Sequence, residues 1–127
     1  MNQKTILLAD DDFGLIVLYR TILEKSGFRV ITARDGESAL SIALEEKPSA
    51  IVIDISMPKK DGIAVCKAIR NDIDWGKNVP IVLLTGKEVD EIGMDNILGV
   101  NPAFYFTKGG SSADEFAEKI NDLFSGQ

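Results

Sequence analysis

Short apolar runs recur along the chain, and the segments between them carry apolar residues at helical spacing. The first, third and fourth runs are rich in Ile, Val and Leu, which is typical of strands buried on both faces of a parallel sheet. The runs predict five strands, at Thr5–Ala9, Phe28–Thr32, Ala50–Ile53, Ile81–Leu84 and Ala103–Phe106. In the second of these, Arg29 stands between Phe28 and Val30, so we expect a half-exposed edge strand there.

Each run is followed by a segment whose apolar residues fall on one face of a helix. Polar and special residues mark the helix ends: Asp12 can cap the first helix, Gly27 follows its end, and Pro48 stops the second. Ser112 and Glu115 form a capping box at the start of the last helix. Four helices have a clear apolar face, and the expected core-facing positions are, helix by helix, Leu15, Leu18, Ile22 and Leu23; Ala39, Leu40, Ala43 and Leu44; Val65, Cys66, Ile69 and Ile73; and Phe116, Ile120, Leu123 and Phe124. A further helix is predicted at Val89–Leu98, where Gly93 interrupts the pattern.

Strands and helices therefore alternate five times, and no internal repeat or low-complexity linker divides the chain. This alternation predicts an α/β fold with a parallel sheet, right-handed crossovers and helices on both faces. A chain of 127 residues has the size of one domain and can bury a core without disulfides. In such sheets the functional site lies beyond the carboxyl ends of the strands, so the residues after each strand carry the candidate chemistry.

Two absences and the charge balance restrict that chemistry. The chain has no histidine, which excludes Ser-His-Asp catalysis, histidine metal sites and a phosphohistidine of its own. Its one cysteine, Cys66, has no disulfide partner and no activating histidine, and fits a small core residue. The net charge of −6 disfavours direct binding of nucleic acid. The longest apolar runs have only strand length, so we expect no membrane insertion, no secretion signal and a cytoplasmic location.

Acidic residues gather at two of the predicted strand ends. Asp10-Asp11-Asp12 follows the first strand, and Asp54 follows the third. If these strands are neighbours, their carboxylates crowd into one pocket, where charges about 4 Å apart repel by several kcal/mol unless protons or cations compensate. Hard oxygen ligands without histidine or cysteine favour Mg²⁺. Taken singly, each residue also has an ordinary structural interpretation, because an aspartate after a strand often caps the next helix.

Four stretches carry the candidate residues: Leu7–Asp12, Ile51–Gly62, Pro80–Gly86 and Phe106–Lys108. In their order and spacing these stretches resemble the receiver domains of two-component response regulators, in particular the single-domain chemotaxis regulators. The resemblance runs from about Lys4 to Phe124. It implies a flavodoxin-like (βα)5 fold with strand order 2-1-3-4-5, and a single receiver domain over residues 1–127 with its core at about 4–124.

The resemblance also implies a role for each residue of the site. The implied assignments are Asp54 as phosphoacceptor; Asp10, Asp11, Asp54 and the backbone carbonyl of Ser56 as ligands of Mg²⁺ or Mn²⁺; Thr85 and Lys108 as the groups that hold the phosphoryl oxygens; and Thr85 with Tyr105 as the switch. In the resting state Lys108 is expected to pair with Asp54 and to favour its ionised form. The chain departs from many receivers after Lys108, where Gly109-Gly110 stands in place of a proline.

The implied function is that of a phosphoacceptor in a phosphorelay. A sensor histidine kinase or a phosphotransfer protein would donate a phosphoryl group to Asp54. The surface of the fourth helix, the fifth strand and the fifth helix would then change for a downstream protein target or an output domain. The chain would be no enzyme beyond its own phosphorylation and dephosphorylation. Whether it is a stand-alone regulator or a receiver from a longer protein stays open.

Three other functions compete with this one. A flavodoxin-like module that binds a nucleotide or flavin would need a phosphate-cradling loop after the first strand, where Asp10-Asp11-Asp12 instead repels phosphate. A phosphatase with an aspartyl nucleophile would usually carry an acid two residues after Asp54, where this chain has Ser56. A pseudo-receiver that acts through protein contacts alone would not need the complete set of acids with Thr85 and Lys108.

Overall fold

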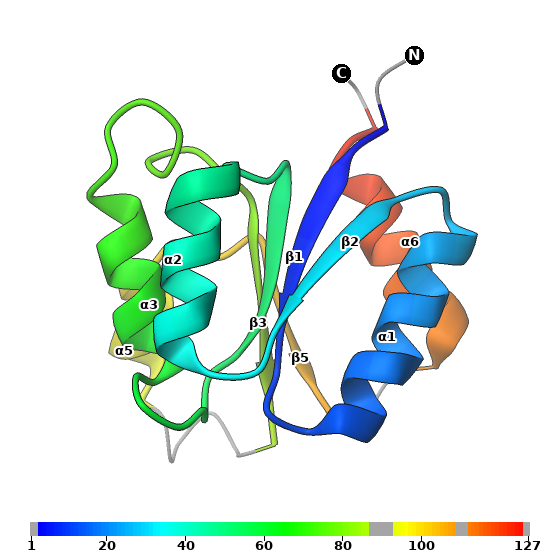
Figure 1. The fold of residues 1–127 in the computed structure, drawn as a ribbon, viewed down its shortest axis with the longest axis horizontal. Coiled ribbons are helices and arrows are strands. Elements are labelled where there is room, and N and C mark those ends of the chain that lie inside the picture. The colour runs from blue at the N-terminus through cyan, green and yellow to red at the C-terminus, as the bar shows by residue number, and fades with distance from the viewer. Residues whose placement is uncertain (1–2, 87–92, 109–111, 126–127) are drawn as a thin grey trace.

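The computed structural model describes residues 3–86, 93–108 and 112–125, and within them strands and helices alternate along the chain. Figure 1 shows the sheet near the centre with helices packed on either side of it. The strands are β1 (Thr5–Ala9), β2 (Arg29–Ala33), β3 (Ala50–Asp54), β4 (Ile81–Thr85) and β5 (Phe104–Thr107). The helices are α1 (Phe13–Lys25), α2 (Gly36–Glu46), α3 (Gly62–Arg70), α5 (Met94–Gly99) and α6 (Ala113–Asp122).

The strands form one parallel sheet in the order β2-β1-β3-β4-β5, which confirms the predicted topology. β1 and β3 are neighbours, with Ala9 opposite Ile53. β3 in turn pairs with β4, so that Asp54 lies opposite Leu84. β2 is an edge strand with Arg29 exposed at its start, as the sequence indicated. The direction of winding reverses between β1 and β3, and this places a crevice at the carboxyl ends of these two strands.

Successive residues of the buried strands contribute to two cores, one on each face of the sheet. Leu7 and Ile53 pack in the core that α2, α3 and α5 cover. Leu8 and Val52 pack in the core that α1 and α6 cover. All four side chains are fully buried, and burial of each contributes roughly 1.5–3 kcal/mol to the free energy of unfolding. The prediction of helices on both faces is therefore confirmed.

Side-chain caps begin α1 and α6 at the positions that the sequence indicated, and α3 also begins with a side-chain cap. Asp12 Oδ1 accepts the N–H of Leu15 at 3.1 Å at the start of α1. Ser112 Oγ accepts the N–H of Glu115, also at 3.1 Å, at the start of α6. Asp61 caps α3 in the same way. Each cap satisfies a backbone N–H that the helix itself leaves without a partner.

Two leucines that were expected to face the core are exposed instead, so that prediction is wrong for Leu18 and Leu44. In α1 apolar residues follow one another around most of the helix, and the side that packs carries Ile16 and Tyr19. Periodicity alone cannot choose between adjacent apolar sides of such a helix. In α2 the small Ala43 lies against the sheet, and Leu44 is rotated away from it by the helical turn.

The third helix is shorter than expected, so the prediction that Ile73 faces the core is also wrong. α3 ends at Arg70, and Ile73 lies beyond it with 79% of its surface exposed. The chain leaves the helix because Asp72 Oδ1 accepts the N–H groups of Trp75 at 2.8 Å and Gly76 at 3.3 Å. Trp75 is a partly buried packing residue, and it donates its indole N–H to the carbonyl oxygen of Pro48 at 2.8 Å.

Strand boundaries agree with the predicted ones to within about one residue: β2 and β5 each begin one position later than expected. The helix predicted at Val89–Leu98 is described only in part. Residues 89–92 lie outside the described residues, and α5 covers Met94–Gly99.

Arg70, which the sequence analysis does not single out, joins the loop after α3 to the loop before β5. Its guanidinium donates to the carbonyl oxygens of Gly76 at 2.9 Å and Val79 at 2.6 Å. It also donates to the carbonyl oxygens of Val100 and Asn101, both at 2.9 Å. One side chain thus holds two loops at the amino end of β4 and β5, away from the acidic residues.

The first and last described segments meet at that same end of the molecule. Lys4 Nζ lies 5.6 Å from the centre of the Phe124 ring. In Figure 1 the start of β1 and the end of α6 lie together at the upper end, and the loops after β1 and β3 lie at the lower end. Across the described ranges, no helix combines the length and the apolar character that crossing a membrane requires.

Candidate functional site

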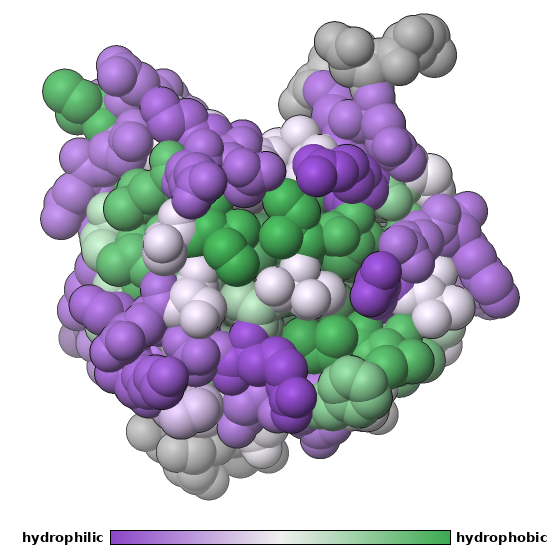
Figure 2. All heavy atoms as spheres, viewed as in Figure 1, coloured by the Kyte–Doolittle hydropathy of each residue, from purple (hydrophilic) through white to green (hydrophobic). Residues whose placement is uncertain are grey.

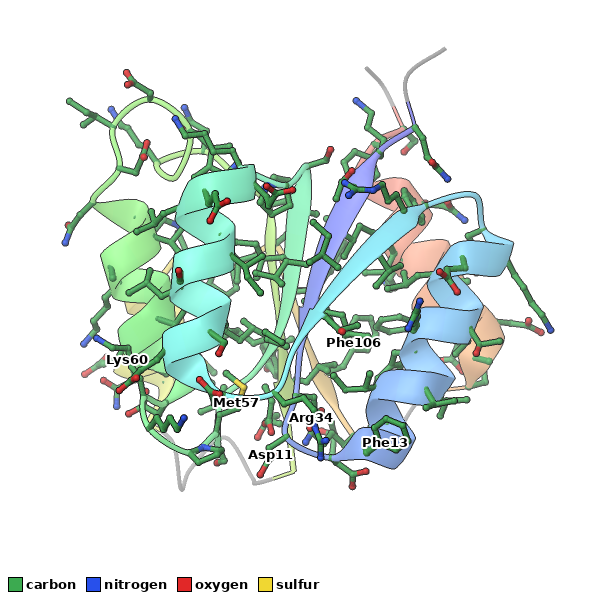
Figure 3. All side chains as sticks on the ribbon, viewed as in Figure 1. Asp11, Phe13, Arg34, Met57, Lys60 and Phe106 are labelled. Atoms are coloured by element: carbon green, nitrogen blue, oxygen red, sulfur yellow. The ribbon has the colours of Figure 1, made fainter. Side chains whose placement is uncertain are left out.

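The carboxyl ends of β1 and β3 bring three aspartates together, and Figure 3 shows one of them, Asp11, at the lower end of the sheet. Asp10 follows β1, and Asp54 is the last residue of the neighbouring strand β3. One carboxylate oxygen from each of Asp10, Asp11 and Asp54 lies within 4.8 Å of the others. Asp10 and Asp54 are buried, whereas Asp11 is exposed and marks the opening of the pocket. The expected acidic pocket is therefore present.

Lys108 reaches this pocket from the far side of the sheet. Its Nζ lies 2.9 Å from Asp54 Oδ2 and 2.9 Å from Asp10 Oδ2. Its backbone N–H donates to the carbonyl oxygen of Thr85 at 2.8 Å, which continues the pairing of β4 with β5 by one residue. This backbone bond fixes the start of the lysine side chain, so the ammonium group is held between two buried carboxylates.

The turns after β1 and β3 orient the two buried carboxylates. The N–H of Asp12 donates to Asp10 Oδ1 at 2.9 Å, and the N–H of Ser56 donates to Asp54 Oδ1 at 3.1 Å. In both cases an aspartate accepts from the residue two positions later, which is a common way to close such a turn. The carboxylates are therefore positioned by local backbone as well as by Lys108.

Burial and neighbouring charges shift the pKa values of Asp54 and Lys108. Burial raises the pKa of Asp54 above its ordinary value of 3.8, the hydrogen bond from Lys108 opposes this shift, and the charge of Asp10 adds to it. For Lys108, burial lowers the pKa, but the hydrogen bonds to Asp54 and Asp10 outweigh burial and the net shift is upward. Lys108 thus favours the ionised form of Asp54, as expected. Burial nevertheless has the larger effect on the pKa of Asp54, and the sequence alone does not show how deeply this carboxylate is buried.

The donor set fits a hard divalent cation. Asp10 Oδ2 is buried and, among the described side chains, is the one buried oxygen or nitrogen without a hydrogen bond, although it lies 2.9 Å from Lys108 Nζ. Three carboxylates against one ammonium leave the pocket with a formal charge of −2. A cation of charge +2 with a preference for oxygen ligands would neutralise it, and Mg²⁺ has these properties.

Thr85 and Gly86 end the strand next to that of Asp54. Thr85 is the last residue of β4 and is buried, whereas Gly86 is exposed. Among the described residues, none has an atom within 4 Å of a Cβ atom placed on Gly86. The hydroxyl of Thr85 and the N–H of Gly86 are therefore candidates to bind a ligand at the strand end.

The two remaining predicted residues lie outside the acidic cluster. Ser56 is exposed in the turn after β3, two residues beyond Asp54. Tyr105 lies on β5 with 45% of its surface exposed, and it lines a shallow surface cavity of about 330 Å³ together with Leu98 and Pro102. Its ring thus faces the surface between α5 and β5. The Gly109-Gly110 turn lies outside the described residues.

Arg34, which belongs to none of the motifs described above, lies beside the acidic pocket. Arg34 is the first residue after β2, and one of its Nη2 hydrogens points to the carbonyl oxygen of Asp11 at 3.5 Å. Its position directly after a strand is the sequence signal that identifies it, because the ends of all parallel strands meet at this edge. The expected end of that strand, Thr32, is one residue short of the observed end at Ala33.

The fold and the pocket define a doubly wound domain with a cluster of aspartates at the carboxyl edge of its sheet. The chain belongs to the response regulator receiver domain family, whose sequence model matches residues 6–119. It is therefore a receiver domain of two-component systems rather than a nucleotide- or flavin-binding module.

Curated relatives include the alkaline phosphatase synthesis transcriptional regulatory protein PhoP of Bacillus subtilis. It is 45% identical over 100 residues, which cover 79% of this chain and 39% of that protein. The transcriptional regulatory protein CpxR of Escherichia coli is 41% identical over 105 residues, which cover 77% of this chain and 42% of CpxR. The chain thus spans about two fifths of the length of these relatives.

Solved structures support the same assignment. The chemotaxis response regulator CheY4 of Vibrio cholerae superposes with a TM-score of 0.87 at 24% identity, covering 97% of this chain and 100% of that one, and shows the same fold. The receiver domain of the sensor histidine kinase PA1611 of Pseudomonas aeruginosa gives a TM-score of 0.85 at 26% identity, covering 99% of this chain and 100% of that one. That domain was solved with a magnesium ion coordinated in its active site cleft.

Proposed function

We propose that Asp54 accepts a phosphoryl group from a phosphohistidine of a sensor histidine kinase or a phosphotransfer protein. The observation that supports this is the setting of its carboxylate, which is buried at the end of β3 with an ammonium group 2.9 Å away and two further carboxylates within 4.8 Å. The chain has no histidine, so the donor imidazole lies outside residues 1–127.

In this transfer a carboxylate oxygen of Asp54 attacks the phosphorus atom and forms a P–O bond. The P–N bond of the donor breaks, its electron pair goes to the ring nitrogen, and a proton on the other ring nitrogen lets the donor leave as neutral imidazole. A carboxylate is a weak nucleophile, so the rate depends on positioning and on stabilisation of charge in the transition state. The turn bond from Ser56 to Asp54 Oδ1 contributes the positioning.

Three groups of the chain would bind the phosphoryl oxygens. Lys108 already lies against Asp54 and can pair with a phosphoryl oxygen without leaving the pocket. The Thr85 hydroxyl and the Gly86 N–H end the neighbouring strand and can donate to a second oxygen. The open space around Gly86 lets the phosphoryl group approach the backbone there.

Asp10, Asp11, Asp54 and the backbone carbonyl of Ser56 would hold Mg²⁺, with Mn²⁺ as the nearest substitute. When bound, the cation neutralises charge on the transferring phosphoryl group. The excess of three carboxylates over one ammonium group in the pocket supports this assignment.

Phosphorylation would change the surface formed by α5, β5 and α6. A dianion on Asp54 would attract the Thr85 hydroxyl, and the Tyr105 ring, now on the surface, would turn into the space that this movement leaves. A downstream protein target or an output domain would recognise the changed surface. We propose that residues 1–127 act in this way as one receiver domain in the cytoplasm, with no catalysis beyond their own phosphorylation and dephosphorylation, no direct contact with nucleic acid and no membrane insertion.

Asp54→Asn tests the assignment directly. With acetyl phosphate and Mg²⁺, the wild-type chain should gain the mass of one acid-labile phosphoryl group, and the gain should disappear with EDTA. Asp54→Asn should show no gain, because an amide cannot attack phosphorus, whereas Asp74→Asn, an exposed loop aspartate, should label as the wild type does. Normal labelling of Asp54→Asn would refute the proposal, and an unlabelled wild type would favour the pseudo-receiver.

A further inference from the structure

Arg34 lies at the opening of the acidic pocket. It follows Ala33, which pairs with Ala9 of β1, so it emerges at the same sheet edge as the aspartates. Its guanidinium carbon lies 5.3 Å from the centre of the Phe13 ring, and Nη2 lies 3.5 Å from the carbonyl oxygen of Asp11. Figure 3 shows Arg34 between Asp11 and Phe13 at the lower end of the sheet.

Phe13 explains how an exposed arginine keeps this position. It is the first residue of α1, and 61% of its surface is exposed, which is unusual for an aromatic side chain. Figure 2 shows the apolar surface over the first turns of α1 at the lower right of the molecule. A guanidinium that lies over an aromatic ring gains cation–π attraction and keeps its N–H groups free for partners in the plane.

The donors of Arg34 are largely unused in the part of the chain that the structure describes. There its one hydrogen bond is the long contact to the carbonyl oxygen of Asp11. Two other cations near this edge are engaged: Lys108 lies between two buried carboxylates, and Lys59 lies 3.9 Å from Asp35. Among the described residues, Arg34 is thus an exposed cation beside the pocket whose donors are available to a ligand.

The charge of the molecule makes such a cation useful. The chain carries −6 overall, and a phosphoryl donor brings further negative charge towards three carboxylates. Even with Mg²⁺ bound, the field around the opening repels an approaching dianion. A planar guanidinium binds two oxygens of a phosphoryl group at once, which both attracts and orients it.

We propose that Arg34 is a donor-binding residue, which contacts the phosphoryl oxygens of the incoming donor at the opening of the pocket before transfer to Asp54. The inference rests on the proposed function of Asp54. Phe13 is the positioning residue, because its ring holds the guanidinium beside Asp11 and away from the carboxylates.

Arg34→Gln tests this proposal with acetyl phosphate as the probe and saturating Mg²⁺. We expect the second-order rate constant of Asp54 phosphorylation to fall about fivefold at an ionic strength of about 0.1 M, the loss of one exposed charge pair. At about 1 M, where the Debye length shrinks to roughly 3 Å, wild type and variant should differ by less than about twofold. A purely structural role would not produce this dependence on salt.

Three matched variants complete the experiment. Arg29→Gln removes the same charge from the other end of the same strand and should leave the rate constant unchanged. Arg34→Lys keeps the charge but loses the planar guanidinium, so its rate constant should lie between those of the wild type and Arg34→Gln. Phe13→Leu removes the ring and should give a loss smaller than that of Arg34→Gln.

Two outcomes would overturn the inference: equal rate constants for Arg34→Gln and Arg29→Gln at low salt, or a loss of the same size at every ionic strength. Either result leaves the proposed function intact as long as the wild-type chain is phosphorylated on Asp54. Failure of the proposed function shows itself separately, as a wild-type chain that takes up no phosphoryl group.

Discussion

Replacement of Lys108 by methionine tests how the pocket tolerates its own charge. The substitution removes an ammonium group that lies 2.9 Å from both Asp54 and Asp10 and leaves two buried carboxylates without a cation. Breaking a buried ion pair by removing one partner typically costs about 3–5 kcal/mol. Methionine fills much of the volume of the lysine stem, so the loss reports charge more than packing.

Proton uptake sets an upper limit to this cost. A buried carboxylate without a cation can take up a proton instead of staying charged. For a carboxyl group with an ordinary pKa of 3.8, protonation costs about 4 kcal/mol at pH 7 and about 1.5 kcal/mol at pH 5, and the variant cannot lose more stability than this per group. The folded variant then binds more protons than the unfolded chain, so its stability rises as the pH falls from 7 to 5. Water at the exposed opening screens the charges, and we therefore expect a loss of about 2–4 kcal/mol at pH 7 that shrinks by half or more at pH 5.

Urea unfolding measures this loss, with the fluorescence of Trp75, the only tryptophan of the chain, as the probe. Lys67→Met, an exposed lysine on α3, is the control and should cost less than about 0.5 kcal/mol. Addition of Mg²⁺ should stabilise Lys108→Met more than the wild type, because the cation replaces the lost charge. A loss below about 1 kcal/mol at pH 7, or an equal loss at pH 5, would refute the argument.

Two further substitutions test the packing that positions the site. Gly36→Ala places a Cβ atom against the carbonyl oxygen of Lys60, so the loop after β3 has to move, and we expect a loss of about 2–3 kcal/mol in urea unfolding. Gly99→Ala is the control: no described residue has an atom within 4 Å of the added Cβ, so this variant should be neutral or stabilising. Arg70→Met removes four short hydrogen bonds to loop carbonyls and should lower the free energy of unfolding by about 2–4 kcal/mol. Arg70→Lys should lie between this variant and the wild type. Equal stability of Arg70→Met and the wild type would show that water replaces these hydrogen bonds.

The sheet could be predicted from the sequence because its strands are buried on both faces. A continuous apolar run such as Ile51–Ile53 is typical of a strand that is covered by helices on both faces, and in the structure this run lies fully buried in β3. The helix starts were predictable for a similar reason. Asp12 and Ser112 act through hydrogen bonds to their own neighbours, so local sequence is enough to place them.

The faces of the helices were less accessible to prediction. Leu18 and Leu44 are as apolar as the residues that pack, and their exposure depends on which side of each helix meets the sheet. Ile73 follows the helical spacing of α3, but the hydrogen bonds of Asp72 end the helix before it. These outcomes depend on tertiary packing and on loop geometry that a periodic pattern does not contain.

The acidic site likewise has features that the sequence predicts and features that depend on tertiary packing. The residues at the strand ends were predictable, because parallel strands bring their carboxyl ends to one edge and the motif spacing fixes which residues stand there. Neither the depth of Asp54 nor the contact of Arg34 with the Phe13 ring could be predicted. Both depend on how far side chains extend from a backbone whose course the sequence only outlines.

The contact between Lys4 and Phe124 has a practical consequence for binding measurements. Because both segments meet at the end of the sheet opposite the aspartates, an affinity tag on either one anchors the molecule with its acidic pocket towards the solution. If the domain is immobilised on a biosensor chip through a tag on either segment, the opening of the acidic pocket at Asp11 stays accessible to a soluble phosphoryl donor.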